Sequence, residues 1–135
     1  MGKPRGADRT TTTIPLSDGD HLVVINELLA GEESDAWQGA IARTRDESGV
    51  ERVQLDNKSL EFTTAAHFIQ SWSFIDQAGA PIVWPLSVAD RVEILRTKLS
   101  GEDWAEVKKA ITAHETVQAA KKKTTPTGKP EPTTT

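Results

Sequence analysis

Two capping patterns near the C-terminal end constrain the fold of this 135-residue chain more than any other feature. Ser87 is followed three residues later by Asp90, and Ser100 stands in the same relation to Asp103. A serine in this place accepts a backbone N–H from the first helical turn, and the carboxylate is favoured at the same helix end. The sequence therefore predicts two antiparallel C-terminal helices that are divided at residues 100–101.

Both predicted helices carry a single apolar stripe. Its members recur every three or four residues, the spacing of a helix that packs one face on a core. The stripes consist of Val88, Val92, Leu95 and Leu99 in the first helix and Trp104, Val107, Ile111, His114 and Gln118 in the second. Three lysines at 121–123 suit the C-terminal end of the second helix.

The N-terminal part predicts a β-hairpin over residues 11–26. Two strand-like runs flank an Asp18-Gly19 turn signal, and Pro15 places the first run at a sheet edge because proline donates no ladder hydrogen bond. Four residues separate the runs, so a type I turn with a bulge and a two-residue loop both remain open.

The middle of the chain predicts two helices and short extended segments. The first helix covers about 33–45, with Trp37, Ala40 and Ile41 on its packing face, and a half-buried strand follows over 50–55. Residues 59–75 fit both periods, and we expect a helix over 59–70 followed by a strand over 72–75. A turn over 76–79 then leads to an extended segment over 81–85, which prolines limit to an edge strand.

These elements predict an α+β fold with a small N-terminal antiparallel hairpin or sheet packed against helices. We expect a flexible arm over 1–10, a single domain over 11–120 and a disordered Lys/Thr/Pro tail over 121–135, because both ends lack core-forming residues. The length allows one small core.

Composition narrows the classes of partner. The chain has no cysteine, which removes disulfides and thiolate sites and is typical of a reducing compartment such as the cytoplasm. Residues 1–13 carry a charge of +2 and residues 121–135 carry +3, which leaves −9 on the middle of a chain whose total is −4. An acidic core repels phosphate, so we expect no nucleic-acid partner. No apolar run is long enough to suggest a membrane segment.

No residue pattern indicates catalysis, a cofactor or a metal. His21, His67 and His114 lack a partner at metal-ligand spacing, and His114 falls on an apolar stripe as a core or partly exposed helical histidine. The carboxylates cluster at helix ends and in loops, where exposed charge is the ordinary expectation. We therefore expect no catalytic residues, no cofactor and no enzyme.

The four tryptophans are the remaining candidates for a binding role. Trp37, Trp72 and Trp104 each lie on an apolar stripe and are expected in the core. Trp84 lies between Pro81 and Pro85, and an exposed copy there would be an anchor for partner recognition. Trp84 is thus the candidate partner-binding residue.

Several segments together resemble the short tail assembly chaperones of long-tailed, siphovirus-type bacteriophages. The resemblance covers roughly residues 14–123 and consists of packing and turn features. It is carried by Leu-Ser-Asp-Gly at 16–19, Trp-Ser-Phe-Ile-Asp at 72–76 before a Gly/Pro turn, Ala-Ile-Thr-Ala-His-Glu at 110–115 and the lysines at 121–123.

The resemblance implies a non-enzymatic protein that binds and solubilises the tape-measure protein in the bacterial host cytoplasm and is absent from the mature virion. It also implies the major tail protein and a frameshifted longer form of the chain as further partners, because the coding stretch for residues 121–123 suits a ribosomal slip. The alternative is a small structural virion protein, a tail or head–tail connector subunit. The oligomeric state stays open.

Overall fold

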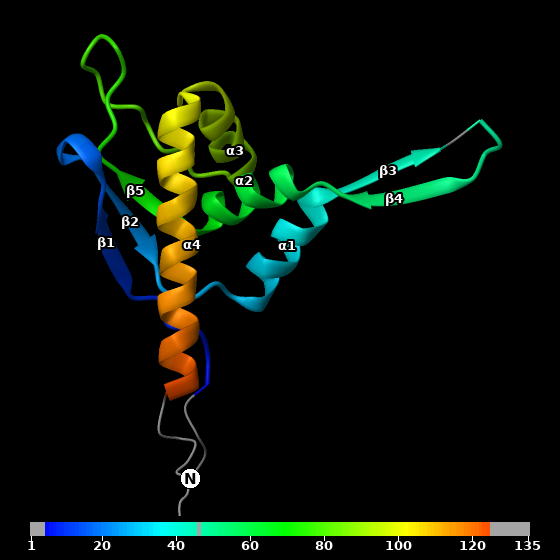
Figure 1. Cartoon of the computed structure of the whole chain (residues 1–135), viewed down its shortest axis with the longest axis horizontal. Coiled ribbons are helices and arrows are strands. Elements are labelled where there is room, and N and C mark those ends of the chain that lie inside the picture. The colour runs from blue at the N-terminus through cyan, green and yellow to red at the C-terminus, as the bar shows by residue number, and fades with distance from the viewer. Residues whose placement is uncertain (1–4, 46, 125–135) are drawn as a thin grey trace, which may run out of the picture.

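An antiparallel three-stranded sheet and four helices form the body of the computed structural model, which describes residues 5–45 and 47–124. The predicted α+β class is confirmed (Figure 1). The sheet has the order β1-β2-β5, with β1 at Thr11–Pro15, β2 at His21–Ile25 and β5 at Ile69–Trp72. The helices are α1 (Ala30–Ala40), α2 (Asn57–Phe68), α3 (Val88–Thr97) and α4 (Gly101–Thr124).

Part of each predicted end lies outside the described residues. This holds for residues 1–4 of the expected arm and residues 125–135 of the expected tail. Residues 121–124, which were expected to begin the tail, instead continue α4 to its end at Thr124.

The predicted N-terminal hairpin is confirmed, with β1 at the edge of the sheet. The strands are joined by a single 3₁₀ turn at Ser17–Gly19, in which Asp18 and Gly19 have φ values of 58° and 81°. Both angles lie in the left-handed region that aspartate tolerates and glycine favours. Ser17 donates through its backbone N–H and its Oγ to the Glu106 carboxylate at 2.7 and 2.9 Å, which fastens the turn to α4.

Helix α1 ends earlier than predicted, and the expectation of a helix to residue 45 is wrong. Ile41 begins strand β3 (Ile41–Arg45), which pairs antiparallel with β4 (Glu51–Leu55). The ladder starts at the helix end itself, because Asp56 donates its N–H to Ala40 O at 2.7 Å. The helical spacing of Trp37, Ala40 and Ile41 hid this strand, since that spacing shows which residues could share a helix face and does not show where the helix ends.

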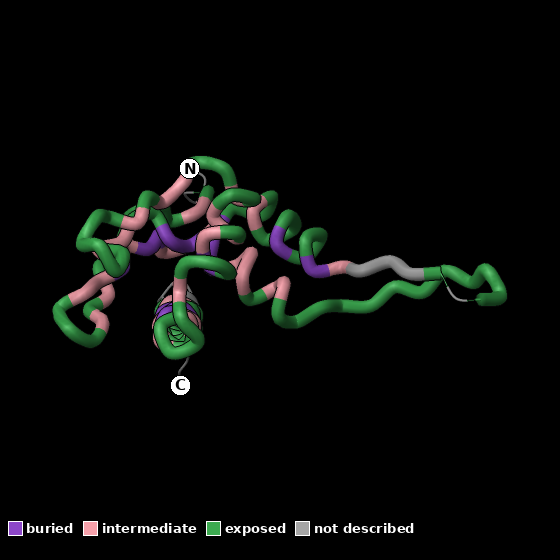
Figure 2. Tube along the Cα trace, turned by 90° about the horizontal axis from the view of Figure 1, so that it is seen from above, coloured by how far each residue is buried: buried purple, intermediate pink, exposed green. Residues whose placement is uncertain are grey.

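The β3–β4 hairpin projects from the body, as Figure 1 and Figure 2 show. Every residue of β4 is exposed, so the predicted strand is present at 51–55 but its expected half-burial is wrong. A strand becomes half-buried only when another layer covers one of its faces. No described element packs over β4.

Helix α2 and strand β5 follow each other without a loop. Asp56 caps α2 by accepting the N–H groups of Lys58 and Ser59 at 3.0 and 3.3 Å. The strand predicted over 72–75 and the helix end predicted at 70 are both wrong, because α2 ends at Phe68 and β5 spans Ile69–Trp72. Pairing with β2, which places Trp72 opposite Leu22, decides this boundary.

Beyond β5, the turn predicted over 76–79 is present. The 81–85 segment forms no named strand, and it meets the residues before the turn at an isolated bridge between Ile75 and Pro81 and through the Ile82 N–H, which donates to Phe74 O at 2.9 Å.

Both C-terminal helices begin at the predicted caps. Ser87 Oγ accepts the N–H of Asp90, and Ser100 Oγ accepts the N–H of Asp103, each at 3.1 Å. Helix α3 packs chiefly against α2, and α4 passes across the body as its longest element (Figure 1).

The core lies where β2, α2 and the C-terminal helices meet (Figure 2). Its largest side chains are fully enclosed, namely Leu22, Val24, Ile69, Leu95 and Val107. Helix α1 packs on α2 through small residues. A Cβ at Gly39 would lie 3.1 Å from Thr63 Cγ2, so glycine permits the close approach of the two helices.

Candidate functional site

The three histidines lie in three different elements. His21 lies in β2, His67 near the end of α2 and His114 in α4. Across residues 5–45 and 47–124, no group of three histidine or carboxylate side chains could hold a metal ion. Among the helices of this part of the chain, none is long and apolar enough to cross a membrane.

His114 is a hydrogen-bonded core residue, one of the two interpretations that its sequence position left open. It is 5% exposed, and its Nε2 lies 3.0 Å from Ile25 O. The ring of Phe68 meets it edge-on at 5.8 Å. The imidazole therefore links α4 to the end of β2.

Trp72 and Trp84 form a packed pair beside the sheet. Their rings lie 4.5 Å apart, and each indole N–H donates to a backbone carbonyl, to Ile82 O at 2.7 Å and Ile69 O at 2.9 Å respectively. The Arg91 guanidinium lies 5.3 Å from the Trp84 ring. Trp84 is therefore half-buried, and its indole N–H already has a hydrogen-bond acceptor within the chain. It lacks the exposure that a recognition anchor needs.

The exposed tryptophan is Trp37 in α1, and its expected place in the core is wrong. It is 52% exposed, while Ala36 and Ala40 are the residues of α1 that are buried. Small residues allow α1 to approach α2 closely, which turns the large indole outward. Trp104 packs as expected, stacked on Phe62 at 4.4 Å.

Trp37 lines a groove between α1, α2 and α4. The groove consists of three adjoining hollows that share lining residues. Leu28 and Glu33 line two of the hollows, Leu60 and Thr64 line two, and Glu115 lines all three.

The groove is elongated because its hollows succeed one another between the helices. The hollow beside Leu28 and Phe68 has a volume of about 360 Å³. Leucine, phenylalanine and tryptophan side chains supply apolar contacts along it. Such a surface suits a helix laid into a groove better than a small compact ligand.

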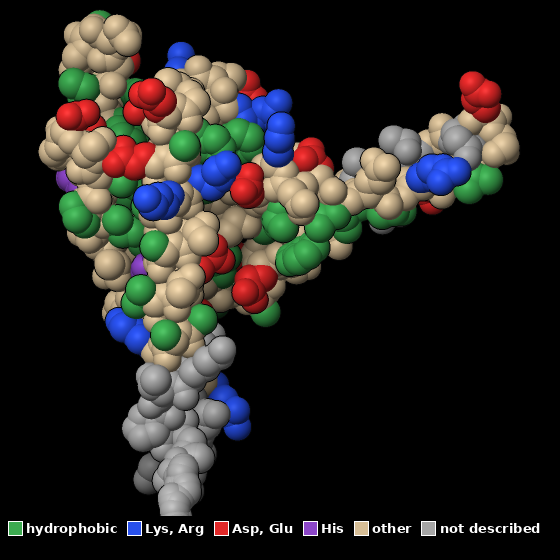
Figure 3. Space-filling view, viewed as in Figure 1, with side chains coloured by type: hydrophobic (Ala, Val, Ile, Leu, Met, Phe, Trp, Pro, Cys, Tyr) green, Lys and Arg blue, Asp and Glu red, His purple; other side chains and the backbone are tan. Residues whose placement is uncertain are grey.

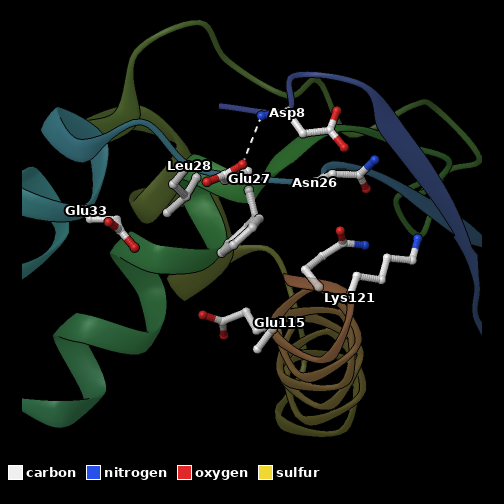
Figure 4. A pocket seen from close by; sticks show the side chains of 10 residues that line it. Asp8, Asn26, Glu27, Leu28, Glu33, Glu115 and Lys121 are labelled. Atoms are coloured by element: carbon white, nitrogen blue, oxygen red, sulfur yellow. Dashed lines mark hydrogen bonds between the residues drawn. The ribbon is translucent and has the colours of Figure 1, made fainter. Parts of the chain in front are cut away.

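Carboxylates rim this groove. Figure 4 shows Glu33 from α1 and Glu115 from α4 extending toward the hollow from different sides. Partial burial raises the pKa of Glu115, and the nearby Glu33 charge raises it further. Glu61 on α2 also lines the groove and meets Lys108 at 3.7 Å. The groove therefore favours an occupant that brings positive charge next to apolar side chains.

A salt bridge holds the wall that α1 contributes. Arg9 donates from both terminal nitrogens to the Glu32 carboxylate, at 2.6 and 3.2 Å, and also to Glu27 O at 3.1 Å. Glu32 in turn accepts the N–H of Leu29, the residue before α1, at 2.8 Å. Burial alone would raise the pKa of Glu32, but these hydrogen bonds outweigh it and lower the pKa. Of the arm predicted over 1–10, the last residues are thus tied to α1.

Sequence reasoning missed the groove because its residues come from elements that are distant along the chain. Leu28 precedes α1, Leu60 lies in α2 and Glu115 lies in α4. The apolar stripe on α4 was the one local signal, since it predicts a packing face on that helix without naming the partner. Neither the spacing nor the charge of these residues indicates which faces of α1, α2 and α4 lie beside one another.

Comparisons with known proteins add no assignment: no protein-family model matches the chain, and no curated protein or solved structure matches it significantly.

Proposed function

We propose that this chain is a non-enzymatic tail assembly chaperone that binds the phage tape-measure protein in the host cytoplasm and keeps it soluble during tail assembly. The observation that carries the proposal is the open groove between α1, α2 and α4, with an exposed tryptophan on its wall. The resemblance of the Trp-Ser-Phe-Ile-Asp segment and its neighbours to this family supplies the identity of the partner.

The groove favours one kind of occupant. Leu28, Leu60 and Trp37 offer apolar contacts, and Glu33 and Glu115 offer negative charge beside them. An amphipathic helix with lysine or arginine flanking its apolar stripe would satisfy both. In the family that the sequence resembles, tape-measure proteins are long and helical, so their helices fit this description before the tail tube encloses them.

We expect binding in this groove to be reversible. The groove is open to solvent, so the area it buries on a helix is modest, and the affinity depends on a few well-packed side chains. A chaperone must release its client when tube subunits polymerise. A moderate affinity therefore suits the proposed role better than a tight one.

The experiment is a calorimetric titration of the full chain with a synthetic amphipathic helix from the tape-measure protein of the same phage. We expect Trp37→Ala to weaken binding about 30-fold, the effect of losing roughly 2 kcal/mol at an aromatic anchor. Val83→Ala is the matched control, because Val83 is 74% exposed and lines none of the three hollows. Equal affinities for the wild type and Trp37→Ala would refute the groove as the binding site.

A structural virion subunit, in the tail or the head–tail connector, is the second candidate. The projecting β3–β4 hairpin favours it, because an uncovered hairpin offers an edge to which another subunit can join. Quantitative mass spectrometry of infected lysate and purified virions separates the two. A chain abundant in lysate and absent from virions supports the chaperone, whereas a fixed copy number per virion refutes it and supports the structural subunit.

A further inference from the structure

The β3–β4 hairpin exposes more apolar side chain than a solvated ribbon should. Val53 is 57% exposed and Leu55 is 42% exposed, and no described element covers either. Figure 3 shows hydrophobic side chains at the root of the hairpin and along one side of it. A two-stranded hairpin alone in water is marginally stable at best. Additional strands beside the hairpin would stabilise it.

The backbone of β4 offers that partner an edge. The bond from Asp56 N–H to Ala40 O fixes which residues carry the ladder to β3, because hydrogen-bonded and non-hydrogen-bonded pairs alternate. Glu51, Val53 and Leu55 fall at the non-hydrogen-bonded positions. Their N–H and C=O groups consequently point outward, away from β3.

The same residues place their side chains on one face. Val53 and Leu55 are two residues apart, and Leu55 lies opposite Ile41 in the register, so all three share a face of the hairpin. Trp37 lies one helical turn before Ile41. Residues 51–55 thus supply both the outward backbone edge and part of the apolar face.

We propose that this edge pairs with the same edge of a second copy of the chain, antiparallel and centred on Val53, to form a two-fold dimer with a four-stranded sheet. The edge is self-complementary, since Val53 faces Val53 of the second copy and Leu55 faces its Glu51. The pairing satisfies the outward backbone groups of all three residues. It also brings the two apolar faces into one continuous surface.

Charge argues for a second copy as the occupant. Residues 41–55 contain three arginines and three carboxylates and have no net charge, whereas the chain as a whole carries −4. Two copies can therefore meet through their hairpins without the repulsion that two acidic bodies would feel. The hairpins project from the bodies, which keeps those bodies apart (Figure 1).

Sedimentation equilibrium of the full chain tests the dimer. We expect a mass of twice 14.7 kDa at about 100 µM, where a micromolar dimer is saturated. Val53→Lys should give a monomer because it places two like charges opposite each other at the two-fold axis. Gln54→Lys, with the same charge change on the opposite face, should stay dimeric. A monomeric wild type, or a Val53→Lys dimer, overturns the proposal.

A pair of cysteine variants fixes the register. The chain has no cysteine, so Val53→Cys introduces a single thiol at the axis. The two Cα atoms of a hydrogen-bonded antiparallel pair lie about 5.5 Å apart, within the range of a disulfide. We expect Val53→Cys to form a covalent dimer under mild oxidation. Gln54→Cys should not cross-link, since diagonal positions lie about 7–8 Å apart. Equal cross-linking of both variants would refute pairing about Val53.

Discussion

Replacing His114 tests how the core holds the end of β2. Ile25 pairs with Thr11 at a non-hydrogen-bonded position, so its carbonyl points away from β1, and the pairing of β2 with β5 ends at Val24. The His114 ring supplies the hydrogen bond that the sheet does not, at 3.0 Å. His114→Phe keeps a ring in the same place but removes this donor.

The magnitude follows from the burial of both partners. Ile25 is 7% exposed, so its carbonyl would lose its partner without gaining water. Leaving such an acceptor unsatisfied costs about 1–3 kcal/mol. We expect His114→Phe to lower the free energy of unfolding by about 2 kcal/mol and the melting temperature by about 8 °C. His114→Ala should lose more, because it also removes the edge-on contact with Phe68 and leaves a cavity.

Urea unfolding followed by tryptophan fluorescence measures the difference. Thr112→Ala is the control, since Thr112 is an exposed residue two positions earlier on the same helix and its replacement should change stability by less than about 0.5 kcal/mol. If His114→Phe is as stable as the wild type, the hydrogen bond does not hold the strand end, and the reasoning fails.

Two further changes probe the caps and the groove. Ser100→Ala removes the cap of α4 and should cost about 1 kcal/mol by urea unfolding, whereas an unchanged stability would mean that the Asp103 N–H is satisfied by water. Glu115→Gln should be more stable than the wild type at pH 7. Folding raises the pKa of Glu115 above its ordinary value of 4.5. The wild type therefore loses stability as the pH rises from the pKa of the unfolded state through the raised pKa of the folded state. The gain should vanish near pH 4, and a gain that persists there would contradict the titration.

Local signals predicted the elements whose stabilising contacts are also local. The Asp18-Gly19 turn and the caps at Ser87 and Ser100 involve residues at most a few positions apart, and all three are present in the structure. Each gives the chain one favoured conformation before any tertiary contact forms. Propensity and cap chemistry were therefore sufficient there.

The errors fall where a distant partner decides the conformation. Ile41 continues the helical stripe of α1, yet its pairing with Leu55 turns it into a strand. Trp37 lies on the same stripe, yet α1 buries alanines and leaves the indole outside. The groove combines both problems, because three elements create it and no single one reveals it. Burial and pairing at these sites depend on contacts that periodicity does not record.

Pro15 has a consequence for how the sheet ends. In the β1–β2 ladder the even-numbered residues of β1 carry the hydrogen bonds, as the contacts of Thr10 and Leu16 with the residues flanking β2 show, so the nitrogen of Pro15 falls on the outward side. The proline therefore costs the sheet no internal bond and withholds one donor from any strand that would add to β1. Pro15 thus opposes the addition of further strands to β1, and so fibril-like growth of the main sheet, without removing a hydrogen bond from the sheet itself.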